Sequence, residues 1–301
     1  MTFQQFLSVV EIRTKIVSLS TFFIACMYIF LGDTAVSPGR LLLLLAAVLM
    51  VDMGTTAFNS FFDYYKGVDS RELEREQEKV LVYQGVAPGA AFLTAAALFA
   101  GAGIIGIYLV YLVGWPLLIL GILSFFTGIL YSGGPRPISH TAFGEIFAGG
   151  FLGMVLFIIV RMVLEDGSVS PGEMLPGLPS TMLIAAILTV NNSCDLEADR
   201  KAGRKTLSIL IGRKASAVLI LLLVLGAFGL QTWFSFAAVG GMQPAAALPV
   251  LAAGAASLVI YGRMVRSGLI QSRKGPSMQG ISRIFLLFTS GVLIGGGISL
   301  I

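Results

Sequence analysis

The sequence has little charge and few cysteines. Charged residues make up 12% of its 301 residues, about half of the roughly 25% typical of soluble globular domains. The two cysteines, Cys26 and Cys194, lie far apart in the chain, and Cys194 lies at the expected cytoplasmic end of an apolar run, where thiols stay reduced. These shortages argue against a soluble domain and against a structural disulfide.

The sequence also lacks a linker and a nucleic-acid footprint. No low-complexity segment divides the chain, and its longest polar segments are residues 67–88 and 194–214. We therefore expect one integral-membrane domain over residues 1–301. The net charge of +4 comes with no basic helix and no interleaved aromatic platform, so nucleic acid is not expected as a partner. No obligate protein partner is evident either.

Long hydrophobic runs are what the sequence has in abundance. Hydrophobic residues make up 56% of the chain, and a run of about 20 apolar residues crosses the hydrocarbon core of a bilayer as a helix. Weak period-2 alternation favours helices over a β-barrel, the other architecture that satisfies every backbone group in lipid. The sequence predicts an all-α polytopic membrane bundle of nine transmembrane helices, at residues 14–32, 41–66, 89–113, 115–131, 143–164, 178–198, 215–239, 244–264 and 281–301.

The distribution of basic residues predicts the orientation in the membrane. If the N-terminus is cytoplasmic, every Lys and Arg except Arg40 and Arg161 falls in or beside a cytoplasmic segment, as the positive-inside rule requires. We therefore expect a multi-pass protein of the cell membrane with a cytoplasmic N-terminus. Nine spans then place the C-terminus outside.

Two acidic motifs close the second and the sixth apolar run. Asn59 and Asp63 are four residues apart and share a helix face, and Asp69 follows Gly67, a residue typical of helix ends. In the second motif, the three residues at intervals of four are Asn191, Asp195 and Asp199, whereas Glu197 faces elsewhere. Because an even number of spans separates the motifs, both emerge on the same face of the membrane.

Carboxylates at a hydrocarbon boundary need compensation, since Asp at the centre of a membrane helix costs about 2.5–3.5 kcal/mol. They could simply cap the spans and pair with loop cations. Two clusters on one face, however, suit Mg²⁺, which takes one or two carboxylates and completes its shell with water and phosphate oxygens. The cations that follow the second motif, Lys201, Arg204 and Lys205, could contact the same phosphates, although the positive-inside rule also accounts for them.

The two motifs, NxxxDxxxGxD from Asn59 and NNxxDxxxDxxxGxxTL from Asn191, resemble those of the UbiA superfamily of membrane prenyltransferases. The stretch YSGGPRPISHTAFGEIFAG at residues 131–149 is similar to the branch of this family that prenylates 1,4-dihydroxy-2-naphthoate in menaquinone synthesis. Two positions depart from the family pattern. Ser60 stands where the first motif usually has an acid, and Cys194 stands where this branch often has a basic residue.

The resemblance implies a helical bundle around a central cavity, with a polyprenyl diphosphate and an aromatic acceptor as substrates and Mg²⁺ as cofactor. The metal ligands would be Asp63, Asp69, Asp195 and Asp199, with Asn59 and Asn191 in support and Lys201, Arg204 and Lys205 on the diphosphate. The expected catalytic residues are Asp63, Asp195 and Glu145. On the acceptor side, Tyr131 and Arg136 would bind the substrate, with Arg136 pairing its carboxylate and Glu145 orienting or deprotonating a ring hydroxyl.

Other interpretations stay open. The glycines and prolines of the 131–140 loop could form no more than a tight turn, with Glu145 capping the next helix and the lone His140 serving a structural role. Another branch of the family would use a different acceptor, such as 4-hydroxybenzoate. A secondary transporter also carries acids within its spans, and Asp52, inside the second apolar run, keeps that class in consideration.

Overall fold

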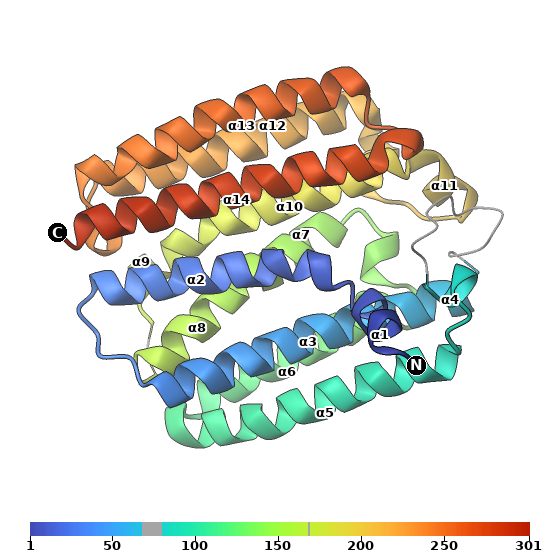
Figure 1. Ribbon diagram of the computed structural model, residues 1–301, viewed down its shortest axis with the longest axis horizontal. Coiled ribbons are helices and arrows are strands. Elements are labelled where there is room, and N and C mark those ends of the chain that lie inside the picture. Colours follow the sequence, from blue (N-terminus) through green and yellow to red (C-terminus); the bar gives the residue numbers. More distant parts are fainter. Residues whose placement is uncertain (68–79, 168) are drawn as a thin grey trace.

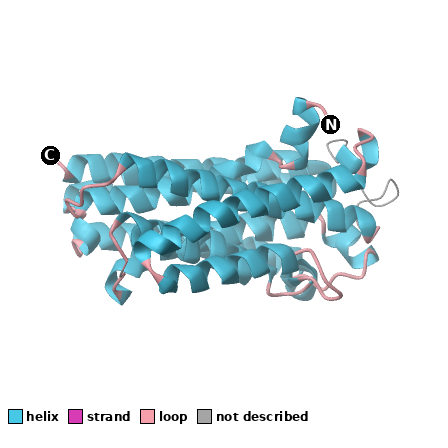
Figure 2. Ribbon diagram, turned by 90° about the horizontal axis from the view of Figure 1, so that it is seen from below, coloured by secondary structure: helices cyan, strands magenta, loops and turns pink. Residues whose placement is uncertain are grey.

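The helices run side by side along the long axis of the protein (Figures 1 and 2). The computed structural model describes residues 1–67, 80–167 and 169–301, and in these residues it contains helices and no strands. The long apolar helices are α2 (Ile16–Leu31), α3 (Pro38–Tyr65), α5 (Pro88–Val113), α6 (Trp115–Leu130), α8 (Leu156–Leu164), α10 (Leu178–Cys194), α12 (Leu207–Phe236), α13 (Ala247–Ser267) and α14 (Lys274–Ser299).

Shorter elements join or extend these helices. The short α-helices are α1 (Phe3–Val9), α4 (Val80–Tyr83), α7 (Gly144–Gly149), α9 (Pro171–Met174) and α11 (Leu196–Lys201). A π-helical segment, η3 (Gly150–Val155), links α7 to α8. The 3₁₀ turns are η1 (Ile12–Lys15), η2 (Ile138–His140), η4 (Leu175–Gly177), η5 (Val239–Gly241), η6 (Pro244–Ala246) and η7 (Gln271–Arg273).

Each of the nine predicted spans corresponds to a helical segment. Within the described residues, eight segments are long and apolar enough to cross a membrane, and α6 is a shorter apolar helix. Its 16 residues extend about 24 Å, against the roughly 30 Å of a hydrocarbon core. The fold class is therefore as predicted, a polytopic all-α bundle.

Small residues let the helices approach one another closely, as is common in membrane proteins. The clearest case is the crossing of η3 and α10, where a Cβ added to Gly153 would lie 2.5 Å from the Cα of Thr181. At Gly149 an added Cβ would lie 2.5 Å from the carbonyl oxygen of the same threonine. This crossing packs α7 and η3 closely against α10.

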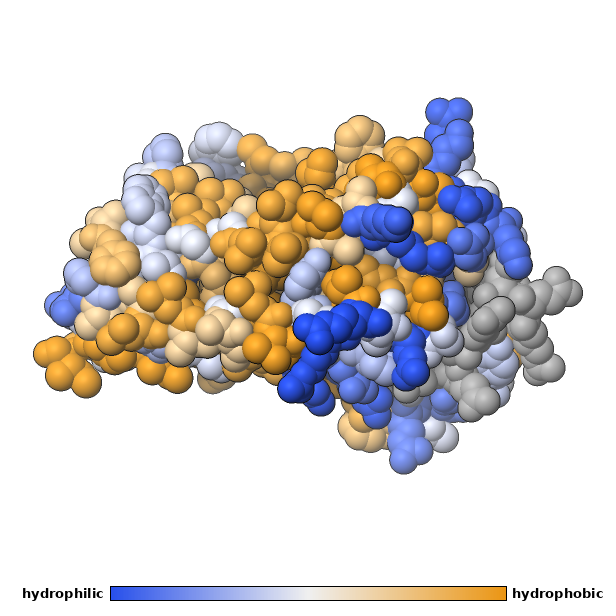
Figure 3. Space-filling view, turned by 90° about the horizontal axis from the view of Figure 1, so that it is seen from above, coloured by the Kyte–Doolittle hydropathy of each residue, from blue (hydrophilic) through white to orange (hydrophobic). Residues whose placement is uncertain are grey.

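Polar residues gather at one end of the bundle and an apolar belt covers the rest. Figure 3 shows hydrophobic residues over the left and middle of the molecule and hydrophilic ones concentrated at the right-hand end. In Figure 1 this is the end that carries α4 and α11. At the opposite end, Arg40 pairs with Asp166, and Arg161 pairs with Glu165 at 2.7 Å.

Candidate active site

A cavity of about 1890 Å³ runs through the middle of the bundle. One end is lined by Asp63, Asp195, Asp199, Arg204 and Lys274, and the remainder is lined mainly by apolar side chains of α3, α5, α6 and α8. Charged residues elsewhere in the lining are Glu11, Arg13, Asp52 and Arg283. Along α3 the lining extends from Asp63 to Leu44, an axial distance of about 28 Å at the α-helical rise. The shape suits a molecule with an anionic head and a long apolar tail.

Arg204 joins the two acidic motifs. Its Nη2 lies 3.1 Å from Asp63 Oδ2 and its Nη1 lies 3.2 Å from Asp199 Oδ1. Both carboxylates are 5% exposed, so this contact is shielded from solvent. Two helix ends separated by more than a hundred residues thus meet at the head of one cavity.

The chain positions Arg204 by a reversal at the end of α11. Gly203 has φ 75°, a left-handed conformation that glycine adopts without a Cβ penalty. The Arg204 amide donates to the Asp199 carbonyl at 2.9 Å, and the Gly203 amide donates to the Arg200 carbonyl at 3.2 Å. This Schellman pattern turns the chain back, so the Arg204 guanidinium lies over the Asp199 side chain.

Lys274 is a site residue that the motif analysis missed. It begins α14, lines the cavity, and its Nζ lies 2.7 Å from Asp195 Oδ2. In sequence it is one of several cations in a polar loop, with no spacing relative to either motif. Only the packing of α14 beside α10 brings it to Asp195.

Each of the three motif aspartates that the structure describes has one carboxylate oxygen paired with a cation and one buried oxygen without a hydrogen-bond partner. The latter are Asp63 Oδ1, Asp195 Oδ1 and Asp199 Oδ2. Buried anionic oxygens without a partner are costly, and a hard cation is the ligand that satisfies them. Among the described residues no three acidic, His or Cys side chains form a ready-made metal cage. Mg²⁺ does not require one, because it retains waters and binds substrate phosphate oxygens.

The pKa of Asp199 is raised, chiefly because the carboxyl group is buried. Burial raises its pKa from 3.8 to about 6, the Asp195 charge adds to this, and the guanidinium of Arg204 only partly offsets both. The carboxylate is therefore underneutralised by the described side chains. A bound cation would lower this pKa again. Asp69, the fourth expected metal ligand, lies outside the described residues.

The two motif asparagines both line the cavity. Asn59 Oδ1 accepts a hydrogen bond from the Ser132 hydroxyl, which ties the end of α3 to the 131–140 loop. Asn191 lies one turn before Asp195 and is half-buried. Ser60, which replaces an acid of the family pattern, also lines the cavity and donates to the Val9 carbonyl at 3.5 Å.

Of the residues expected to act on the acceptor, the structure places only Tyr131 in the cavity lining. Tyr131 lines the cavity, and burial, followed by the charge of Glu145, raises the pKa of its phenol. Arg136 is exposed and is not among the residues lining the cavity. Glu145 is buried behind the wall, where its Oε1 accepts from Asn192 Nδ2 at 2.9 Å, and Asn192 is the member of this pair that reaches the cavity.

Of the three cations after the second motif, the structure brings only Arg204 to the cavity. The side chains of Lys201 and Lys205 are exposed and do not line it. The backbone amide of Lys205 donates to the carbonyl of His140 at 2.8 Å. Burial, followed by the charges of Arg204 and Lys66, lowers the pKa of His140 to about 4, so this histidine is neutral at physiological pH.

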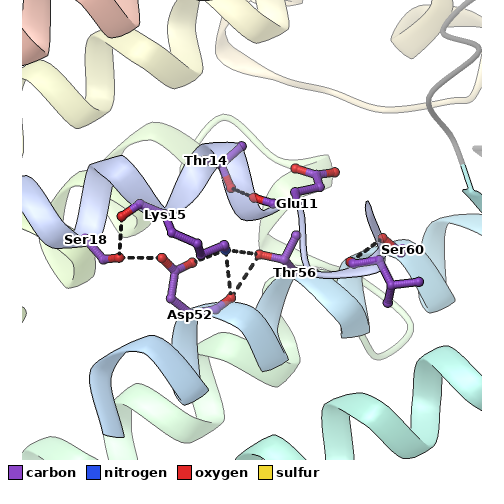
Figure 4. A network of polar contacts seen from close by, with 8 residues as sticks. Glu11, Thr14, Lys15, Ser18, Asp52, Thr56 and Ser60 are labelled. Carbon is purple, nitrogen blue, oxygen red and sulfur yellow. Dashed lines mark hydrogen bonds and ion pairs between the residues drawn. The ribbon is translucent and has the colours of Figure 1, made fainter. Parts of the chain in front are cut away.

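Asp52, the acid that favoured a transporter, is bound in a local network (Figure 4). Its Oδ1 lies 2.6 Å from Lys15 Nζ, and its Oδ2 accepts from the Ser18 hydroxyl at 2.6 Å. Lys15 also donates to the Thr56 hydroxyl and is 2% exposed. Asp52 is thus the partner of a buried lysine, and the transporter hypothesis loses the observation on which it depended.

Comparison with known proteins gives a family match over most of the chain. A family model described as the UbiA prenyltransferase family matches residues 18–274. The chain is 33% identical over 179 residues to the 1,4-dihydroxy-2-naphthoate octaprenyltransferase of Bacillus subtilis (strain 168), which covers 60% of this chain and 57% of that protein. It is 30% identical over 176 residues to the protein of the same name from Haemophilus influenzae, covering 57% and 56%. The matched part spans little more than half the length of either relative.

A solved structure shares the fold. The UbiA homolog from Archaeoglobus fulgidus bound to DMAPP and Mg²⁺ superposes with a TM-score of 0.64 at 16% sequence identity, covering 94% of this chain and 99% of that one. At this identity the likeness establishes the arrangement of helices.

Proposed function

Because the chain belongs to the UbiA prenyltransferase family, we propose that it transfers a polyprenyl group from an allylic diphosphate to an aromatic acceptor, 1,4-dihydroxy-2-naphthoate. The observation that carries this proposal is the convergence of Asp63 and Asp199 on Arg204 at the head of a long, largely apolar cavity. The names of the Bacillus and Haemophilus relatives favour the naphthoate acceptor.

The charged end holds the diphosphate. The unpartnered oxygens of Asp63, Asp195 and Asp199 would hold Mg²⁺, with Asp69 as the further ligand that the motif predicts, and the metal would supply positive charge to the departing diphosphate. Asn59 and Asn191 support these ligands from the same helix faces. Arg204 and Lys274 lie beside the carboxylates, where they donate to diphosphate oxygens and keep the head group in place.

The prenyl transfer itself needs separation of charge in a dry site. The bond between C1 of the prenyl group and the diphosphate oxygen breaks, and the electron pair leaves with the diphosphate. An aromatic carbon then supplies the electron pair of the new C–C bond and restores its ring by losing a proton or carbon dioxide. The apolar lining excludes water, which would otherwise capture the allylic cation.

Glu145 acts on the acceptor through Asn192. Its carboxylate is behind the cavity wall and its Oε1 fixes the Asn192 amide, so the amide oxygen is free to face a ring hydroxyl of the acceptor. This makes Glu145 a positioning residue, a narrower role than the catalytic one that the sequence predicts. Tyr131, on the same wall, contributes a protonated phenol.

The test is transfer of radiolabelled prenyl diphosphate to a panel of acceptors by the purified protein, with and without Mg²⁺. We expect product with 1,4-dihydroxy-2-naphthoate and little with 4-hydroxybenzoate, and no product after chelation. Asp63→Asn and Asp195→Asn should each lower the rate by about 100-fold, the upper range for loss of a group that serves a metal site.

Glu197→Gln is the matched control, because Glu197 belongs to the same motif segment but is exposed and pairs with Arg200 and Arg213. It should retain the wild-type rate. Transfer that survives both aspartate substitutions would refute the proposed site, and transfer to 4-hydroxybenzoate alone would replace the acceptor.

A further inference from the structure

Arg283 is a cation inside a membrane-spanning helix that makes no hydrogen bond or ion pair with any described residue. It lies nine residues after Lys274 in α14, within the span Gln271–Ser299. The expected span 281–301 places Arg283 at the start of the helix, whereas α14 begins at Lys274 and carries Arg283 about 14 Å further along the helix axis.

The packing of α2 against α14 gives the depth of Arg283. The two helices run in the same direction side by side (Figure 1), and a Cβ added to Gly296 would meet Met27. Thr14 lies thirteen residues before Met27, and Arg283 lies thirteen residues before Gly296. Since the two helices rise almost equally, Arg283 is level with Thr14 and with its neighbour Lys15, and Lys15 pairs with Asp52 near the middle of α3.

Arg283 also lines the cavity, on the side where η1 and α14 form the wall. Gln279, four residues earlier and therefore on the same helix face, lines it too, as does Ser282. The other described cations at this cavity have partners: Arg204 and Lys274 pair with aspartates and Lys15 with Asp52, and Arg13 also has one. The cavity therefore contains one guanidinium whose charge is uncompensated by the described side chains.

The side chain of Arg283 is exposed at this cavity, and an ionisable side chain of a membrane-spanning helix that faces a cavity marks a site of function. Resting on the proposed function, we propose that Arg283 binds the carboxylate of the aromatic acceptor. A guanidinium recognises a carboxylate through two parallel hydrogen bonds, and Gln279 supplies a further donor on the same face. Arg136, which the sequence favoured for this role, and Arg283 are both exposed, and of the two only Arg283 lines the cavity.

The spacing along α14 suits this assignment. The diphosphate end is marked by Lys274 at Asp195, and Arg283 follows about 14 Å along the axis. Both side chains line the same cavity, so a molecule bound between them would connect the diphosphate end with Arg283. An acceptor held by its carboxylate at Arg283 thus presents its ring to the C1 end of the prenyl diphosphate.

The experiment compares wild type with Arg283→Gln, Arg283→Lys and Arg263→Gln in nanodiscs of neutral lipid. Arg263 is exposed on the neighbouring α13 and does not line the cavity, so Arg263→Gln is the matched control. Prenyl transfer is measured with 1,4-dihydroxy-2-naphthoate and with its 2-carboxamide. Binding of radiolabelled naphthoate without prenyl diphosphate is measured by equilibrium dialysis.

We expect Arg283→Gln to raise the KM and the dissociation constant for the naphthoate by about 10- to 100-fold, the effect of losing a hydrogen bond to a charged group. The KM for the prenyl diphosphate should stay at the wild-type value. Arg283→Lys should recover part of the loss, and the preference for carboxylate over carboxamide should disappear in Arg283→Gln.

Three results would overturn the proposal. They are an unchanged naphthoate affinity in Arg283→Gln, a change in the KM for prenyl diphosphate instead, and a defect that appears only when anionic lipid is added, which would assign Arg283 to a lipid phosphate. If the wild type binds the naphthoate through Arg283 but transfers no prenyl group, this inference stands and the proposed function fails.

Discussion

Lys15 and Asp52 form an ion pair at the middle of the bundle, and each depends on the other. Lys15 is 2% exposed, and its ammonium lies 2.6 Å from Asp52 Oδ1. Removing one partner leaves a buried charge uncompensated, which costs about 3–5 kcal/mol. Asp52→Asn should therefore lower the free energy of unfolding by that amount, measured by thermal unfolding in detergent.

Two further variants complete this test. Arg40→Gln breaks an exposed pair with Asp166, and exposed pairs contribute about 0–1 kcal/mol. The double variant Lys15→Met/Asp52→Leu removes both charges and should recover most of the stability. If Asp52→Asn and Arg40→Gln unfold at the same temperature, the Lys15–Asp52 ion pair does not contribute measurably to stability.

The sequence predicts the positions of charged residues in motifs better than the positions of isolated charged residues. Asp63 and Asp199 could be expected to meet, because i to i+4 spacing at the ends of spans fixes both face and depth. Lys15 and Arg283 could not be placed, because counting loop cations depends on where a span begins, and hydropathy does not fix helix ends within polar stretches such as KGPSMQGISR. Lys274 and Asn192 depend on helix packing, of which a single sequence carries no signal.

At the scale of the element, the crossing of η3 and α10 has no spare room. Gly153→Ala would place a Cβ 2.5 Å from the Thr181 backbone, and an overpacked contact of this kind typically costs about 1–3 kcal/mol. The melting temperature of Gly153→Ala should fall accordingly. Gly150→Ala is the matched control in the same segment, since a Cβ there meets nothing within 4 Å. Equal melting temperatures for the two variants would contradict the packing.

The spans were predictable as elements, and their details were not. All nine apolar runs are helical, because a continuous apolar run without period-2 alternation satisfies its backbone in lipid as a helix. The π-helical segment Gly150–Val155 escapes prediction, since an apolar pattern fits α and π hydrogen bonding equally well. π segments are common at functional sites, and this one follows the helix that carries Glu145.

At the scale of the whole molecule, the orientation in the membrane remains a prediction from charge. A cysteine introduced at Ser272, next to Lys274 at the charged end, should react with a membrane-impermeant maleimide only from the cytoplasmic side. One at Ala245, at the other end of α13, should react only from outside. Both positions are exposed, and the native Cys26 and Cys194 are buried, which keeps background labelling low. Labelling of each cysteine from the opposite side would show that the orientation in the membrane is the reverse of the predicted one.

The cavity has the motif aspartates at one end and a largely apolar lining along α3 toward Leu44. A long-chain substrate can occupy it in one direction only, with its phosphates beside the aspartates. In the proposed function both phosphates would therefore leave at the same surface from which they arrived, and no anion would have to cross the bilayer. The proposed reaction would thus need neither a flippase step nor an ion gradient.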